Sequence, residues 1–269
     1  MDSKDLGFDS RLIHGGMFED QFGSATVPIY QTSTFKFKNA DHGAACFAGE
    51  SDGYIYTRIN NPTIDAFEKL IAGLENGYAA IACSSGMGAV NTIYMGLLKQ
   101  GDHMISTAAV YGPSRVVMEK QYARFGIESS YVDTSDVAQI RKAIRPNTRM
   151  IFIETPSNPT MDITNLKEVA DLAKEYGLIA VADNTFCSPY LQKPLDEGFD
   201  VVFHSVTKFI NGHADVVGGV IVTREKALYD ILRPVMVNLG CNMDPHQAYL
   251  VIRGVKTLSL RIERSQESA

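Results

Sequence analysis

Between residues 79 and 223, short apolar runs alternate with stretches in which apolar residues recur every three or four positions. The apolar runs predict strands at 79–85, 103–109, 149–156, 178–184, 200–206 and 218–223. The stretches between them predict helices at 86–101, 113–126 and 165–177, each closed by a glycine. Strands that alternate with helices indicate βαβ units around a buried, mostly parallel sheet, which is an α/β fold.

The chain on either side of this region has a different pattern. The residues before Asn61 are irregular and rich in turn residues, which predicts an extended N-terminal arm. A helix is expected after Asn61-Pro62-Thr63, because proline suits a first helical turn, and residues 246–269 predict an amphipathic helix. We therefore divide the chain into an arm at 1–62, an α/β domain at 63–255 and a last segment at 256–269. Because no stop signal ends this last helix, we expect the segment to be the start of a truncated C-terminal domain.

Composition and charge exclude several classes of protein. Hydrophobic residues make up 45% of the chain and charged residues 21%, which is ordinary for a globular protein. A net charge of −6 gives no general attraction to nucleic acids or anionic membranes. No apolar run approaches the ~20 residues that span a bilayer, and the N-terminus MDSKDLGFDS lacks the apolar core of a signal peptide. We expect a cytoplasmic protein with neither a nucleic-acid nor a membrane partner.

The cysteines predict neither disulfides nor a metal site. They are scattered along the chain, at Cys46, Cys83, Cys187 and Cys241, with no CxxC pair. Reduced thiols in a cytosolic protein are the simplest interpretation. His204 and His213 could be imagined as metal ligands, but no third ligand is spaced with them, so no metal is expected.

The first candidate for chemistry is the turn SSGMG at 84–88, between a predicted strand and a predicted helix. The free N–H groups and positive dipole end of a helix N-terminus can bind phosphate, which makes Ser85, Gly86 and Met87 candidate ligands. An ordinary tight strand–helix connection would have the same local sequence. The turn is not a P-loop, because the pattern GxxxxGK[ST] is absent.

Polar residues also follow three later strands, and ligands of open α/β sheets bind at such carboxyl ends. Asn158 lies in an ordinary loop sequence, and Asp183 could simply cap a loop. A buried carboxylate is costly unless it is paired, so we expect Asp183 to face a cation. Ser205, Thr207 and Lys208 end the strand at 200–206, where a poorly hydrated lysine would be a nucleophile suited to a Schiff base. A lysine that reaches solvent is the alternative.

Together these residues match the requirements of pyridoxal phosphate (PLP). A lysine holds its aldehyde, an acid keeps its pyridine nitrogen protonated, and backbone and hydroxyl donors hold its phosphate. A nucleotide-binding Rossmann protein is disfavoured, because no GxGxxG opens a helix after the first strand.

Longer motifs carry a resemblance to one family across nearly the whole chain. They are VPIYQTSTF (27–35), AACFAGE (44–50), YTRINNPT (56–63), SSGMGA (84–89), AVYG (109–112), ETPSNP (154–159), VADNTF (181–186), SVTKFINGHADVVGG (205–219) and RGVKTLSLR (253–261). The chain resembles the Cys/Met-metabolism PLP enzymes, which include methionine γ-lyase, cystathionine lyases and synthases, and O-acetylhomoserine sulfhydrylase. The resemblance implies the large domain of a type I PLP-dependent transferase, which is aspartate aminotransferase-like.

The resemblance also implies roles for individual residues. Lys208 would be the Schiff-base lysine and proton shuttle, Asp183 would pair with the pyridine nitrogen, and Tyr111 would stack on the ring and help protonate the leaving group. The implied phosphate ligands are Gly86, Met87, Ser205 and Thr207, and Asn158 would contact the ring hydroxyl. Tyr56 and Arg58 would reach the phosphate of a neighbouring subunit, so the resemblance implies a homo-oligomer, either a dimer with shared sites or a tetramer.

The implied activity is elimination of a sulfur leaving group from a sulfur amino acid, which yields a 2-oxo acid, ammonia and a thiol. One alternative is a synthase that replaces the γ-substituent of an activated homoserine with a thiol. Pro113 stands where methionine γ-lyases carry a cysteine, and VMVNLGCNMDPH lacks their Lys-Asp pair, so the substrate stays open. A third possibility is a cofactor-binding but inactive fragment, because relatives continue into a domain with the arginine that binds the substrate carboxylate.

Overall fold

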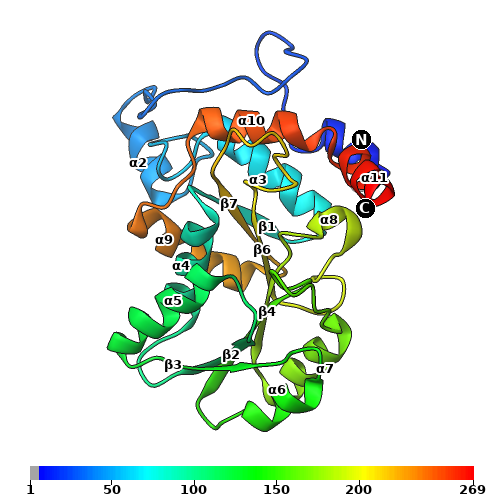
Figure 1. Ribbon diagram of the computed structural model, residues 1–269. Coiled ribbons are helices and arrows are strands. Elements are labelled where there is room, and N and C mark those ends of the chain that lie inside the picture. Colours follow the sequence, from blue (N-terminus) through cyan, green and yellow to red (C-terminus); the bar gives the residue numbers. More distant parts are fainter. Residues whose placement is uncertain (1–5) are drawn as a thin grey trace.

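The computed structural model describes residues 6–269, and in that part of the chain one seven-stranded sheet forms the centre (Figure 1). The strands are β1 (Ala79–Cys83), β2 (His103–Thr107), β3 (Glu128–Val132), β4 (Thr148–Glu154), β5 (Ile179–Asp183), β6 (Val201–Ser205) and β7 (Gly219–Thr223). Their order across the sheet is β1-β7-β6-β5-β4-β2-β3. All strands that the sequence predicts are present, whereas β3 has no counterpart among the predictions.

The direction of the strands determines where a ligand could bind. From β6 to β3 all neighbouring strands are parallel, whereas β7 is antiparallel to both β6 and β1. Strand β1 therefore points the same way as β6, and the carboxyl ends of β1, β4, β5 and β6 share one edge of the sheet. The predicted mostly parallel sheet is confirmed.

The central strands are apolar on both faces because both faces are covered. On β4, Met150 and Phe152 pack on one side, and Ile151 and Ile153 on the other, all fully buried. Helices α4 (Gly86–Leu97), α5 (Gly112–Lys120) and α9 (Lys226–Leu239) contribute to the core on the Phe152 side. The opposite core includes residues of α3 (Pro62–Leu74), α6 (Val137–Ala143), α7 (Leu166–Tyr176), α10 (Pro245–Val255) and α11 (Leu258–Ser268).

The predicted amphipathic helix over residues 246–269 is wrong as a single helix, because α10 ends at Val255 and α11 begins at Leu258. Val255 and Leu258 are both buried in the same core, so the break does not interrupt the apolar stripe that the sequence shows. At the break, the Thr257 N–H donates to the Gly254 carbonyl at 3.3 Å, which closes a tighter turn.

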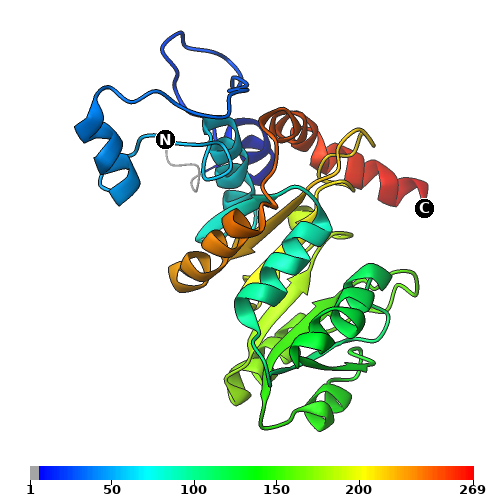
Figure 2. The same ribbon diagram turned by 90° about the vertical axis from the view of Figure 1, so that its left-hand side faces the viewer.

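The arm is less extended than predicted, because it contains α1 (Phe8–His14) and α2 (Ala40–Ala48). Both helices are short, so their apolar spacing is too brief to be recognised in the sequence. Figure 2 shows α2 projecting away from the sheet. Helices α6 and α9 also have no counterpart among the predicted elements, while α8 (Ser188–Leu191) and the 3-10 helix η2 (Tyr122–Phe125) are single turns. No helix in residues 6–269 has the length and apolar character needed to cross a membrane.

Candidate active site

A cavity of about 260 Å³ opens at the carboxyl ends of β4, β5 and β6, beside the N-terminus of α4. It brings together most of the site residues that the sequence predicts, namely Ser85, Gly86, Met87, Tyr111, Asn158, Asp183, Ser205, Thr207 and Lys208. They meet because strands that run the same way end at one edge of the sheet.

The N-terminus of α4 forms one wall and has free donors. Its N-cap is Ser85, whose hydroxyl accepts a hydrogen bond from the Gly88 N–H at 2.9 Å. The N–H groups of Gly86 and Met87 precede the first intrahelical bonds, so the helix provides them with no acceptor. A Cβ on Gly86 would lie 2.9 Å from the Cβ of Ser205, so glycine lets the helix begin directly against the end of β6. This wall suits an anion such as a phosphate.

Asp183 also lines the cavity and is the last residue of β5, with 8% of its surface exposed. The Thr185 N–H and hydroxyl both donate to its Oδ1, at 3.0 and 2.5 Å. Burial raises the pKa of the Asp183 carboxyl, and the hydrogen bonds from Thr185 oppose that shift. No lysine, arginine or histidine of the described chain forms an ion pair with Asp183, so the expected cation does not come from residues 6–269. The carboxylate fits a ligand that carries a protonated ring nitrogen.

Glu154 is a cavity residue to which the sequence analysis assigns no role. It ends β4 directly opposite Asp183, and its Oε2 accepts a hydrogen bond from the Tyr111 N–H at 2.6 Å. Burial, followed by the charge of Asp183, raises the pKa of Glu154 to about 8. We expect Glu154 to keep its proton near neutral pH. The signal was available, because Glu154 follows an apolar strand just as Asp183 does and opens the motif ETPSNP.

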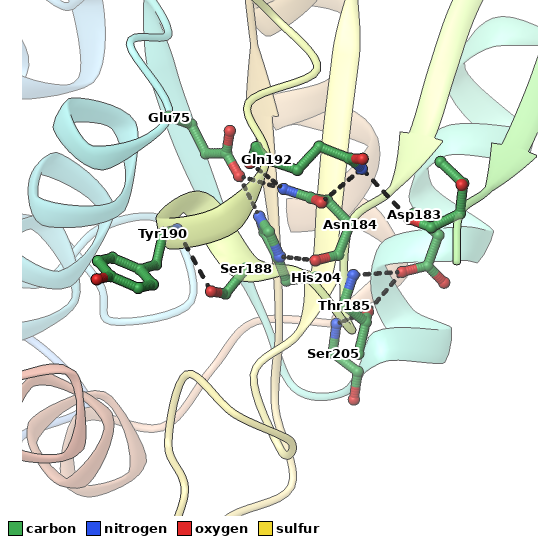
Figure 3. A network of polar contacts seen from close by, with 10 residues as sticks. Glu75, Asp183, Asn184, Thr185, Ser188, Tyr190, Gln192, His204 and Ser205 are labelled. Carbon is green, nitrogen blue, oxygen red and sulfur yellow. Dashed lines mark hydrogen bonds and ion pairs between the residues drawn. The ribbon is translucent and has the colours of Figure 1, made fainter. Parts of the chain in front are cut away.

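A buried polar network holds together the ends of β5 and β6, which border the cavity (Figure 3). The His204 ring contacts Glu75 Oε1 through Nε2 at 2.7 Å and the Asn184 carbonyl through Nδ1 at 3.1 Å. Because a carbonyl only accepts, Nδ1 carries a proton. Asn184 donates its side-chain amide to Glu75 Oε1 at 3.0 Å and to the Gln192 carbonyl at 2.8 Å. His204, Glu75 and Asn184 are fully buried, so the network joins β5 and β6 to the end of α3.

A second bond between these strand ends lies beside that network. The Ser205 N–H donates to the Thr185 hydroxyl at 2.9 Å, and the same hydroxyl donates to Asp183 (Figure 3). The end of β6 therefore fixes the group that orients the Asp183 carboxylate. His204 thus has a structural environment, and no cluster of three or more metal-ligating side chains occurs in the part of the chain that the structure describes.

Lys208 lines the cavity but is exposed to solvent. Of the two alternatives for this lysine, the structure supports the one that reaches solvent, because β6 ends at Ser205 and Lys208 lies three residues further on, in a turn. Thr207 in the same turn accepts a hydrogen bond from the Gly218 N–H at 3.1 Å. Tyr111 is 45% exposed and also lines the cavity.

Tyr56 and Arg58 lie outside this cavity. They line a separate hollow with Thr32, Asn242 and Asp244, among other residues. Arg58 donates to the Val237 carbonyl at 2.7 Å, and its guanidinium carbon lies 5.5 Å from the centre of the Tyr56 ring. The chain therefore does not bring its own arm residues to its own cavity.

Comparisons with known proteins agree with this site. The model of the family described as "Cys/Met metabolism PLP-dependent enzyme" matches residues 9–269. L-methionine gamma-lyase of Porphyromonas gingivalis is 44% identical over 98% of this chain and 66% of its own length. Cystathionine gamma-lyase of Bacillus subtilis is 46% identical over 96% of this chain and 66% of its own length.

A solved structure, cystathionine gamma-lyase from Lactobacillus plantarum complexed with L-serine, superposes with a TM-score of 0.89 at 41% identity. The match covers 95% of this chain and 65% of that protein. This chain therefore spans about two thirds of the length of the relatives it matches. The matches confirm the predicted family resemblance, the α/β fold class and PLP as the cofactor.

Proposed function

This chain belongs to the Cys/Met metabolism PLP-dependent enzyme family, and from this we propose that it eliminates a sulfur leaving group from a sulfur amino acid. The products would be a 2-oxo acid, ammonia and a thiol. One observation carries the proposal: a single cavity holds Lys208, the buried Asp183 carboxyl with no cation from residues 6–269, and the free N-terminus of α4. The names of the relatives, methionine gamma-lyase and cystathionine gamma-lyase, support the choice of reaction.

When bound, PLP supplies an electron sink that stabilises negative charge on the substrate's Cα. In this proposal the Lys208 amine removes the Cα proton and returns a proton further along the substrate chain. Asp183, oriented by Thr185, stabilises positive charge on the pyridine nitrogen. Tyr111 would contact the ring and give a proton to the departing sulfur, and Asn158 would hold the ring hydroxyl; both line the cavity.

The remaining cavity residues would hold the cofactor's phosphate. Backbone N–H groups at the start of α4 supply one set of donors, from Gly86 and Met87, with Ser85 beside them. The hydroxyls of Ser205 and Thr207 supply the other set, from the end of β6 and the turn after it. These ligands fix the position of the ring without taking part in proton transfer.

We also propose an assembly in which Tyr56 and Arg58 of one copy contact the phosphate in the cavity of another. Their separation from their own cavity supports this arrangement, and a guanidinium fork suits a phosphate. A dimer would satisfy it, and a tetramer would repeat it. The division into an arm at 1–62, a cofactor domain at 63–255 and a further segment from 256 belongs to the same proposal, as does a cytoplasmic location.

The test is product analysis with methionine, cystathionine and O-acetylhomoserine, using the product of the complete gene. Release of 2-oxo acid and ammonia from methionine or cystathionine would support the lyase. A new thioether from O-acetylhomoserine and an added thiol, without 2-oxo acid, would identify the replacement synthase instead. Retention of cofactor with turnover of none of the three would favour an inactive binder.

A further inference from the structure

The turn that carries Lys208 ends in four consecutive carbonyl groups, each with its own hydrogen-bond donor. The first and last are satisfied locally: the Gly212 N–H donates to the Lys208 carbonyl at 2.8 Å, and His213 Nδ1 donates to the Asn211 carbonyl at 2.6 Å. The two between them, of Phe209 and Ile210, accept from the guanidinium of Arg261 at 2.6 and 3.3 Å. The end of a helical turn leaves carbonyls unpaired, and here a distant arginine pairs them.

Arg261 lies on α11 and connects the Lys208 turn to the end of α10, and this end of α10 packs against the turn (Figure 1). The guanidinium also donates to the Gly254 carbonyl at 2.9 Å and to the Thr257 hydroxyl at 3.2 Å. No carboxylate within residues 6–269 forms an ion pair with Arg261, so its hydrogen bonds within that part of the chain go to carbonyl and hydroxyl oxygens. A cation at the carbonyl end of a helical turn is electrostatically favourable.

Two glycines allow this close approach. Gly212 has a φ of +74°, and a Cβ on it would lie 2.0 Å from Arg261 Nη1. A Cβ on Gly254 would lie 2.2 Å from the Asn211 carbonyl oxygen. The motif RGVKTLSLR contributes nothing to the cavity, yet through Gly254 and Arg261 it fits against SVTKFINGHADVVGG, which carries Lys208.

We propose that Arg261 is a positioning residue, which holds the backbone turn from which Lys208 reaches the cavity. The Lys208 side chain is exposed, so its approach to the cavity depends on the backbone that carries it. Without the guanidinium, the Phe209 and Ile210 carbonyls would turn towards water and the turn would loosen. The inference rests on the proposed function only for the role of Lys208, because the contacts themselves do not depend on the activity.

The test compares Arg261→Met with Arg264→Met, a control on the same helix whose side chain is 79% exposed and pairs with Glu267. In the cofactor-free protein, amide hydrogen exchange is measured by mass spectrometry for peptides covering 206–213. We expect exchange there to speed up at least about tenfold in Arg261→Met, as loss of charged hydrogen bonds implies. In Arg261→Met the strands of the sheet should exchange at the wild-type rate, and the whole Arg264→Met protein should do the same.

The second readout is the rate at which borohydride-stable PLP appears on Lys208 after mixing. We expect Arg261→Met to slow this attachment about tenfold and to lower kcat more than it raises KM, with Arg261→Lys in between, because an ammonium cannot span both carbonyls. Exchange in 206–213 equal to that of Arg264→Met, or faster exchange spread evenly over the chain, would overturn the proposal. If Arg261→Met fails to fold, the same comparison with Arg261→Lys decides the matter.

The failure of the proposed function would look different. If wild-type protein attaches no PLP to Lys208, the function is wrong, and hydrogen exchange in the cofactor-free protein still tests what Arg261 holds. If wild-type attachment is normal and Arg261→Met matches it in rate and in exchange, only the positioning role is wrong.

Discussion

The strand-end cavity and the arm hollow, which contains Tyr56 and Arg58, are built in different ways. In the cavity, Asp183 and Ser205 end buried strands, so the sheet itself determines where their side chains lie. In the arm hollow, Tyr56 belongs to an isolated β-bridge with Thr34, and the exposed Arg58 donates to a single backbone carbonyl. Strand ends assemble a site within one chain, whereas Tyr56 and Arg58 do not reach that site in their own chain.

The contacts that hold the two regions in place also differ, because those near the cavity are buried and those of the arm hollow are exposed. Near the cavity, the fully buried Glu75, Asn184 and His204 form a continuous hydrogen-bonded network. A buried network that loses one member leaves the others unpaired, at a cost of about 1–3 kcal/mol for each group. The Arg58 contact is exposed, so its loss within one chain should cost little. Arg58 should therefore matter mainly where a second copy is bound.

The largest effect is expected for Lys208→Ala. Removal of the amine should abolish covalent attachment of PLP and reduce turnover to background, whether or not loose cofactor stays in the cavity. Lys120→Ala, which removes an exposed lysine of α5, is the matched control. Absorbance of the bound cofactor and product formation are the measurements. An unchanged cofactor spectrum in Lys208→Ala would assign the role to another lysine.

Asp183→Asn should rank second, because it keeps the shape of the side chain and removes its charge. Without the anion the protonated pyridine nitrogen loses stabilisation worth at least about 1–3 pKa units. We expect PLP to stay bound while turnover slows by orders of magnitude. Single-turnover kinetics beside the exposed control Asp171→Asn measure this, and near-normal rates in Asp183→Asn would give the electron-sink role to another group.

Arg58→Ala tests whether the arm contributes to the cavity of its own chain or to that of a neighbouring chain. Cofactor retention and dimer stability should both fall. An Arg58→Ala chain mixed with a Lys208→Ala chain, each nearly inactive alone, should regain part of the activity. One site of that hybrid receives its lysine and its arginine from intact copies. Hybrids verified by mass and still inactive would mean that Arg58 acts within its own subunit or only structurally.

The smallest effect concerns Glu154, whose pKa is raised from 4.5 to about 8 by burial and by Asp183. The folded protein keeps a proton that the unfolded chain releases above about pH 4.5, so this group's effect is to lower stability as the pH rises from 4.5 to 8. Glu154→Gln cannot titrate and should lose less stability over that range. Thermal unfolding of the cofactor-free protein at several pH values, with the exposed Glu197→Gln as control, measures it; parallel curves for all three proteins would refute the shift.

The sequence predicts the cavity far better than the surroundings that hold it. Asp183, Ser205 and Lys208 follow apolar runs, and parallel strands bring such ends together wherever the chain places them. Glu154 also follows an apolar run, but it lies within the motif ETPSNP, from which only Asn158 was selected as a candidate. His204 and Arg261 could not be found by pattern, because their partners lie far away in the chain and no local spacing records those contacts.

The sequence leaves open whether Lys208 is buried or exposed, because strand periodicity does not show where a strand ends. Val206 is apolar and fully buried like most residues of β6, although the strand stops at Ser205. The prediction of an extended arm missed α1 and α2, because these helices are too short for periodicity to reveal them. Pattern therefore locates the buried strands and most helices between them, but it misses the short α1 and α2 and also the 14-residue α9.

The central claim is that the strand-end cavity binds PLP through Lys208. The most direct measurement is reduction of the PLP-loaded protein with borohydride, followed by mass mapping of its peptides. The account predicts one added pyridoxyl phosphate group per chain, on the peptide that contains Lys208. A label on any other lysine, or none in a protein that retains PLP, would contradict it.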